Sequence, residues 1–214
     1  MENTAQDLVK NDLTALHTKI ESASLPPELK DKIIAMVDRL ERMVNQGFYS
    51  EEFEKASHYV DWATSLPWDK RVDRPIDLTS IKVILDRNHY GMNEVKQRIL
   101  EYMAVLKLRL NKGLGTARAP IILLVGLVGT GKTTIASSIA EAMGRKFVRV
   151  PFGGLGDPLD LRGQSRLRPD AEPSLIIKAL RRAGTKNPVI LLDEIDRVTD
   201  EGRSSIMGVL VELL

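Results

Sequence analysis

The chain has 214 residues, 43% hydrophobic and 28% charged, which is typical of a folded globular protein with one domain or two. Its formal net charge of +2 produces no overall field that would indicate nucleic acid or an anionic membrane as a partner. Cysteine is absent, which excludes disulfides, thiol catalysis and cysteine-ligated metal sites.

The beginning of the chain shows no sign of export. Its first residues contain no basic segment followed by an apolar one, as a signal peptide requires. No apolar run approaches the roughly 20 residues that span a bilayer. We therefore expect a cytoplasmic protein with no membrane partner.

Residues 1–112 are predicted to form an all-α region. Apolar residues recur at three- and four-residue spacing on both sides of Pro26-Pro27, which predicts two helices. The positions are Val9, Leu13, Leu16, Ile20, Leu29, Ile33, Val37, Leu40 and Val44. This pattern fits a helical neck that pairs with other subunits through a coiled coil, and equally an ordinary helical hairpin. Further helices are predicted over residues 50–66, 79–87 and 95–110, and residues 113–119 are predicted to be a linker.

Residues 120–214 alternate between predicted strands and helices. Strands are expected at residues 121–125, 147–150 and 189–192, with helices after each of them. Such alternation is typical of an α/β domain with a parallel sheet. The predicted fold class of residues 120–214 is therefore α/β, and the all-α region precedes this domain.

The junction of the first strand and its helix carries a phosphate-binding motif. Gly126, Gly131, Lys132 and Thr133 fit the pattern G-x-x-x-x-G-K-[ST]. Glycines let the backbone N–H groups approach a phosphate, and the helix directs its positive end toward it. Lys132 is expected to neutralise phosphate oxygens, and Thr133 to ligate Mg²⁺. The predicted ATP-binding residues are Gly126, Leu127, Val128, Gly129, Thr130, Gly131, Lys132, Thr133 and Thr134.

The third strand leads into a second part of the same site. Val189–Leu192 is an apolar run that ends in Asp193-Glu194, the Walker B pattern. Carboxylates at this end of a buried parallel strand emerge where ligands bind in open α/β sheets. Asp193 is expected to hold Mg²⁺, and Glu194 to activate the attacking water as a general base.

Several segments together resemble the AAA+ module of the Lon ATP-dependent proteases. They are His89-Tyr90-Gly91, Gly153-Gly154, Arg162-Gly163 and residues 95–102, 144–149, 183–189 and 192–196. The resemblance implies that the α/β domain is a truncated P-loop NTPase core of the AAA+ type, preceded by the all-α region. It implies a homohexameric ring that hydrolyses ATP and pulls polypeptides through a central pore, as part of a serine protease. It also implies that His89, Tyr90 and Gly91 pack near the adenine. The alternative for these three residues is a helix-terminating turn with a core tyrosine.

The chain departs from this family at three places. Leu127-Val128 replaces the usual proline pair of the P-loop, and the family's Gly-Asp-Pro segment is missing near Ser204-Ser205-Ile206. Arg168 occupies the position where relatives carry an aromatic residue that grips the translocating chain.

Other parts of the family's pattern cannot be placed in the chain. The family's peptidase dyad, sensor strand, arginine finger and helical lid are missing, so we expect them beyond Leu214. In AAA+ proteins the strand after Walker B lies between the Walker A and Walker B strands. We therefore expect the two halves of the sheet not to be joined within these residues.

Two other functions stay open. One is an AAA+ remodeller without peptidase activity, for which Arg162, Arg166 and Arg168 leave nucleic acid as a partner that nothing else supports. The other is a nucleotide-dependent assembly module without turnover. The presence of Lys132, Asp193 and Glu194 argues against the second.

Overall fold

The computed structural model describes residues 2–45, 51–113, 121–166, 168 and 170–214, and it divides into two compact units. One unit comprises Met1–Lys70 and Arg162–Lys186, and we call it the helical unit. The other comprises Arg71–Leu161 and Asn187–Leu214, and we call it the P-loop unit.

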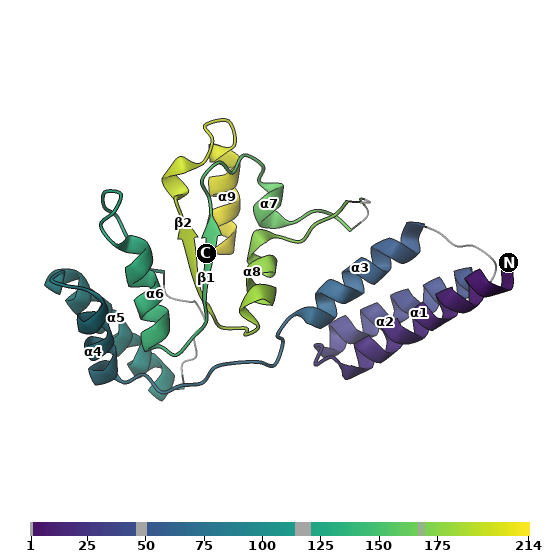
Figure 1. Cartoon of the computed structure of the whole chain (residues 1–214), viewed down its shortest axis with the longest axis horizontal. Helices are drawn as coiled ribbons and strands as arrows, with labels where there is room; N and C mark the ends of the chain where they lie inside the picture. The colour runs from purple at the N-terminus through teal and green to yellow at the C-terminus, as the bar shows by residue number, and fades with distance from the viewer. Residues whose placement is uncertain (1, 46–50, 114–120, 167, 169) are drawn as a thin grey trace. The chain divides into compact units, whose positions relative to one another are not determined.

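The helical unit is built on α1 (Glu2–Ser22), α2 (Pro27–Asn45) and α3 (Glu51–Ser65), which pack against one another (Figure 1). Pro27 is the first residue of α2, where its missing N–H removes no helical hydrogen bond. The buried core is Leu13, Leu16, Ile20, Leu25, Ile33, Val37, Leu40, Val44, Phe53, Ala56, Val60 and Ala63. Most predicted apolar positions are therefore confirmed, while the side chain of Val9 lies outside the described residues. The hairpin fits this packing, and pairing with other subunits stays a prediction.

A later segment, residues 162–186, belongs to the same unit. It contains α8 (Leu175–Ala183), which Ser174 caps by accepting a hydrogen bond from the Ile177 N–H. The guanidinium of Arg181 lies 4.2 Å from the ring centroid of Trp62 on α3. The backbone N–H of Lys186 donates to the carbonyl of Lys70 at 2.8 Å. These contacts join α8 to α3 although more than a hundred residues separate them in the chain.

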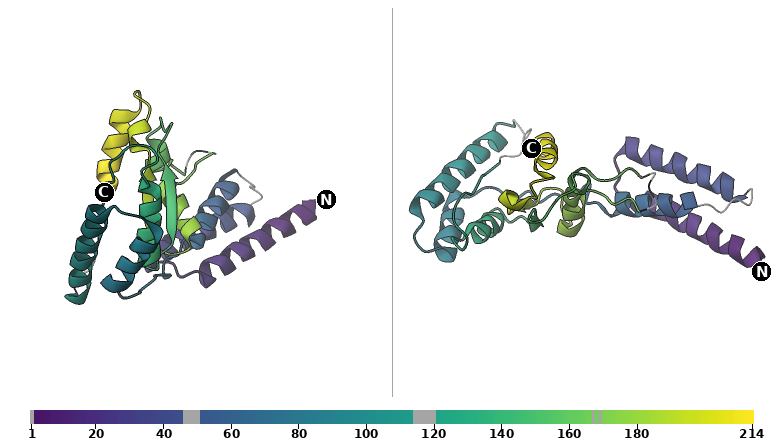
Figure 2. Two further views of the ribbon diagram at one scale, coloured as in Figure 1. Left: turned by 60° about the vertical axis from the view of Figure 1, so that its left-hand side comes forward. Right: turned by 90° about the horizontal axis from the view of Figure 1, so that it is seen from above.

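The P-loop unit is built around α4 (Leu78–Asn88), α5 (Asn93–Asn111) and α6 (Lys132–Ala142), and α4 packs against the other two (Figures 1 and 2). Asp77 caps α4 by accepting hydrogen bonds from two backbone N–H groups of its first turn. Hydrogen bonds from Ser80 and from the backbone of the cap lower the pKa of Asp77. The shared core is Ile76, Ile81, Leu85, Ile99, Met103, Leu106, Ile135, Ile139 and Met143.

The sheet of the P-loop unit has two described strands, β1 (Phe147–Pro151) and β2 (Val189–Asp193), which pair in parallel. Pro151 lies opposite Asp193, so the carboxyl ends of the two strands meet. Both strands contact α6. A short α7 (Leu159–Arg162), a 3-10 turn (Ile195–Arg197) and α9 (Arg203–Leu213) complete the described elements after β1. The predictions of these two strands and of the helix that follows each are confirmed.

The predicted strand at residues 121–125 is wrong. Within the described part of the chain these residues pair with no strand, and the side chains of Leu123 and Val125 are 77% and 86% exposed. A strand exists only when a neighbour accepts and donates its backbone hydrogen bonds. Neither described strand lies beside this segment. The expectation that the two halves of the sheet are not joined within these residues agrees with this.

The predicted division at residues 112 and 120 differs from the two units. Helices α4 and α5 share their core with α6, so they belong with the P-loop rather than with α1–α3. The predicted linker lies outside the described residues except for Gly113. Assignment of residues 1–112, 113–119 and 120–214 to domains stays a prediction. In the described ranges, no helix is both long and apolar enough to span a membrane.

Candidate nucleotide-binding site

The loop before α6 has the backbone geometry of a phosphate cradle. Gly129 and Gly131 have φ angles of 82° and 88°, in the left-handed region that favours glycine. Gly131 is the N-cap of α6 and makes no side-chain capping hydrogen bond. The first N–H groups of a helix have no intrahelical partner and favour an anion. The loop therefore directs several backbone donors and the helix dipole at one place.

Lys132 lies over this loop. Its ammonium donates hydrogen bonds to the carbonyl oxygens of Gly126 and Leu127, at 2.7 and 2.8 Å. An ammonium group has three N–H donors, and the loop carbonyls take two of them. The loop's own backbone thus holds the positive charge beside the glycines, where a phosphate would be bound.

The two predicted Mg²⁺ ligands lie together although they come from different elements. The Thr133 hydroxyl on α6 is 3.4 Å from the Asp193 carboxylate at the end of β2. The Asp193 side chain is 14% exposed. A hydroxyl and a carboxylate are the oxygen ligands that Mg²⁺ prefers. The P-loop and the Walker B end thus form one site, and its residues fit a Mg²⁺–nucleotide.

Potential metal ligands also occur elsewhere in the described chain. His17, Asp38 and Glu41 of the helical unit bring ligand atoms within 4.8 Å of one another. His17 lies at ion-pair distance from both carboxylates, so these groups link α1 to α2.

Arg149 is a site residue that sequence reasoning did not identify. Its guanidinium donates from Nε to the same Asp193 oxygen at 2.6 Å. The residue lies on β1 at an exposed position, and β1 pairs with β2. The signal in the sequence was therefore an outward-facing cation on the neighbouring parallel strand. This ion pair fixes the direction of the Asp193 carboxylate.

Glu194 has a strained backbone, and its carboxylate lies beside Arg197 and Gly153. Its φ of 59° is left-handed, which is unusual for a residue with a side chain. The carboxylate lies 3.3 Å from Arg197 and rests against Gly153, where a Cβ atom would come within 2.7 Å of it. No described contact joins Glu194 to Lys132 or Thr133. A positive φ at a residue with a side chain, as at Glu194, is typical of functional positions that the surrounding structure holds in place.

The turn His89-Tyr90-Gly91 is attached to the P-loop helix. His89 is buried, and its Nε2 atom lies 2.9 Å from the Ser138 hydroxyl of α6. Asn88 also donates to that hydroxyl at 3.0 Å. The side chain of Tyr90 is fully exposed. The alternative of a core tyrosine is therefore wrong, because histidine is the buried residue of the turn.

A cavity of about 930 Å³ adjoins the P-loop. One side is formed by α5 and the other by the apolar residues 121–125 with Gly126, Thr130 and Lys132. Its walls are mainly apolar, but α5 also contributes Glu94, Arg98 and Glu101, and Lys132 lies at the P-loop end. A mainly apolar wall with a few polar groups is typical of a small-molecule site.

The sequence was compared with known families and proteins. Residues 122–214 match the family described as ATPase family associated with various cellular activities (AAA). Lon protease of Roseiflexus castenholzii is 40% identical over 204 residues, which are 95% of this chain and 25% of that protein. Lon protease 2 of Thermus thermophilus is 41% identical over 212 residues, 96% of this chain and 26% of that protein. Lon protease of Syntrophus aciditrophicus is 42% identical over 196 residues.

The chain thus spans about a quarter of the length of these relatives, whereas they match nearly all of it. The matched AAA region includes the P-loop, β1, β2 and the Walker B carboxylates. The identity continues through the helices that precede this region. The chain therefore contains a Lon-type AAA+ module.

Proposed function

We propose that residues 126–134 bind the triphosphate of ATP and that Thr133 and Asp193 hold Mg²⁺. The observation that carries this proposal is the 3.4 Å approach of Thr133 to Asp193, which joins the P-loop to the end of β2. The glycines of the loop and the open N-terminus of α6 support it, because both direct N–H donors at an anion.

The proposed roles of the side chains in hydrolysis follow from the contacts that they make in this structure. Lys132 exchanges its bonds to the loop carbonyls for bonds to phosphate oxygens and so neutralises charge. Glu194 accepts a proton from the attacking water after its carboxylate leaves Arg197. Mg²⁺, when bound, supplies further positive charge to the phosphate oxygens. Arg149 holds the Asp193 carboxylate in a fixed orientation.

We also propose that His89, Tyr90 and Gly91 form the contact to the adenine. Tyr90 offers an exposed aromatic face, and His89 fastens the turn to Ser138 on the P-loop helix. An aromatic ring next to a flat base gains stacking as well as apolar burial. The turn that contacts the base and the loop that contacts the phosphates are then both attached to α6.

For the complete protein we propose the activity of its relatives, which carry the name Lon protease. In this proposal the chain drives a cytoplasmic homohexamer that unfolds and translocates polypeptides to a serine peptidase domain. Residues 1–112 act as the helical neck region, and residues 120–214 contribute to the AAA+ core. Of the three arginines that left a nucleic-acid partner open, Arg166 packs on Tyr59 and Met36 of the helical unit.

A second candidate is an AAA+ remodeller without peptidase activity. The observation that favours it is that Arg168 is exposed, at the position where the resemblance implies a gripping aromatic residue. Incubation of the full-length protein with casein and ATP distinguishes the two. Cleavage products support the protease, and ATP turnover without cleavage supports the remodeller.

Two variants of the full-length protein test the ATPase site. Lys132→Ala is expected to abolish ATP binding in calorimetry, because it removes the charge beside the phosphate. Glu194→Gln is expected to bind ATP normally and to lose hydrolysis by about 10²–10⁴-fold, because only the base is removed. Lys112→Ala and Glu201→Gln are matched controls at exposed positions outside the site. Parental hydrolysis in Glu194→Gln contradicts the role of Glu194.

A further inference from the structure

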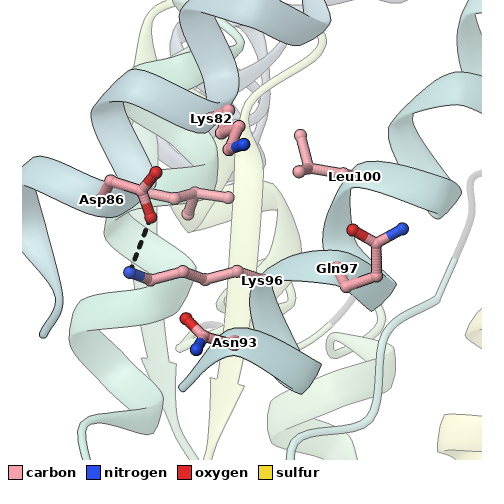
Figure 3. Close-up of a pocket in the computed structure, with 7 residues that line it drawn as sticks. Lys82, Asp86, Asn93, Lys96, Gln97 and Leu100 are labelled. Carbon is pink, nitrogen blue, oxygen red and sulfur yellow. Dashed lines mark hydrogen bonds and ion pairs between the residues drawn. The ribbon is translucent and has the colours of Figure 1, made fainter. Parts of the chain in front are cut away.

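A buried lysine holds the turn between α4 and α5. Lys96, in the first turns of α5, is only 8% exposed. Its ammonium donates to the Asp86 carboxylate at 2.8 Å (Figure 3). It also donates to the His89 carbonyl at 2.7 Å. A buried ammonium is costly unless it is paired and hydrogen-bonded, and here it is both. Nothing in the phosphate site uses this residue.

The position of the His89 carbonyl explains what Lys96 does. His89 is the C-cap of α4, so Lys96 places a positive charge at the negative end of that helix. The hydrogen bond from Lys96 also lowers the pKa of Asp86, which keeps the partner carboxylate charged. Lys96 of α5 therefore caps the C-terminus of α4.

The same histidine is held from a second side. Its ring is paired with Ser138 of the P-loop helix, whereas its carbonyl is bound by Lys96 of α5. A hydroxyl has one proton and two lone pairs, so Ser138 can serve His89 and Asn88 together. Three helices thus fix the residue that precedes Tyr90.

The residues after His89 need this support. Gly91 and Met92 have φ angles of 67° and 56°, and Met92 is one of two non-glycine residues with a positive φ in the described chain. A non-glycine residue in this conformation is strained and persists only where its surroundings hold it. The backbone N–H of Lys96 donates to the Met92 carbonyl at 3.0 Å, and this first hydrogen bond of α5 fastens the end of the turn to the helix. Tyr90 is thereby presented outward from a rigid turn.

We propose that Lys96 and Asp86 are positioning residues for the nucleotide base, because they hold the turn that presents Tyr90 to the purine of ATP. This rests on the proposed contact of Tyr90 with adenine. A turn that is already ordered loses little conformational entropy when the base binds, so fixing it raises the affinity for ATP. The described hydrogen bonds attach the turn to Ser138 and not to the loop at residues 126–131, so we expect the gain in affinity to come from the base contact.

The test compares two ligands in the full-length protein: ATP and inorganic tripolyphosphate, which has the phosphates without the base. Lys96→Met keeps the length of the side chain and removes the ammonium. We expect it to weaken ATP binding about five- to tenfold and to leave tripolyphosphate binding unchanged. Lys82→Met is the matched control, since Lys82 is exposed and lines the same small pocket between α4 and α5 as Asp86 and Lys96. For Lys82→Met, the ratio of the dissociation constants of ATP and tripolyphosphate should equal the ratio in the parental protein.

Tyr90→Ala separates this inference from the function on which it rests. It should shift the ratio as Lys96→Met does, and the double variant should shift it no further than Tyr90→Ala alone. If Tyr90→Ala leaves the ratio unchanged, the base contact itself is wrong. If Tyr90→Ala shifts the ratio and Lys96→Met does not, the base contact stands and the positioning role is overturned.

A merely structural role gives another result. Lys96→Met would then weaken ATP and tripolyphosphate equally, which also overturns the proposal. If Lys96→Met does not fold, Asp86→Asn decides, because Asp86 is half exposed and its loss is milder. A smaller shift of the ratio in the same direction supports the positioning role, and no shift overturns it.

Discussion

Single glycines of the P-loop unit are fixed by close backbone approaches. At Gly202, before α9, a Cβ atom would lie 2.2 Å from the Gly156 carbonyl oxygen and 2.9 Å from its carbon. Both are backbone atoms, so no side chain can rotate away. Gly202 is itself buried, which leaves the segment that carries Gly156 as the part that must move.

We therefore expect Gly202→Ala to lower the free energy of unfolding by about 1–3 kcal/mol, since overpacking forces a backbone shift. A matched control lies in the next helix. At Gly208 of α9 an added Cβ atom meets nothing within 4 Å, so Gly208→Ala should be neutral or stabilising by up to about 1 kcal/mol. Thermal unfolding of both variants measures the difference. Equal unfolding midpoints for the two variants would contradict the close approach of Gly202 to the Gly156 backbone.

Residue positions differ in how far the sequence reveals them. The proximity of Thr133 to Asp193 could be predicted, because motif spacing and strand polarity fix their places before the fold is known. Lys96 and Arg149 could not, because their partners depend on how α5 meets α4 and how β1 meets β2. Their charges resemble those of any solvated surface.

At the scale of elements, α8 is attached to α3 by cation–π contact. The Arg181 guanidinium lies 4.2 Å from the Trp62 ring centroid, and the neighbouring Arg182 is exposed. An exposed pair of this kind contributes about 0.5–1 kcal/mol. The contact explains why a segment so late in the chain belongs to the helical unit.

Arg181→Ala is expected to lower the stability of the helical unit by about that amount, whereas Arg182→Ala should have little effect. The measurement is chemical denaturation followed by tryptophan fluorescence. A double-mutant cycle with Trp62→Ala completes it, because the effect of Arg181→Ala should vanish once the ring is absent. If the effect persists in the Trp62→Ala background, Arg181 acts through another contact.

Elements were predictable where the sequence itself contains what stabilises them. The helices follow from apolar spacing, because each buries one face against a neighbour in the same unit. The predictions of strands β1 and β2 are correct, because each strand supplies the other's hydrogen bonds. Residues 121–125 are as apolar as β2, yet they form no strand. Apolar composition alone therefore predicts burial, and pairing decides whether a strand forms.

At the scale of the whole molecule, the resemblance to Lon proteases raises the question of how firmly the complete protein would hold a polypeptide substrate. Arg168 is exposed, and its backbone N–H donates to the Ser165 carbonyl at 3.0 Å in a turn of the helical unit. A pore that unfolds proteins must hold side chains of any sequence, and a bulky aromatic residue does so by apolar contact. Arginines in a ring of identical subunits instead repel one another and basic segments of substrate.

We therefore predict that the complete protein pulls weakly on folded substrates and favours acidic or already unfolded chains. Arg168→Tyr in the full-length protein should speed ATP-dependent processing of a folded substrate severalfold. Processing of a permanently unfolded substrate should change little, because unfolding does not limit it. Basal ATPase activity should stay constant, since Arg168 is not part of the nucleotide site. Loss of processing for both substrates would show that Arg168 does not replace the gripping aromatic residue.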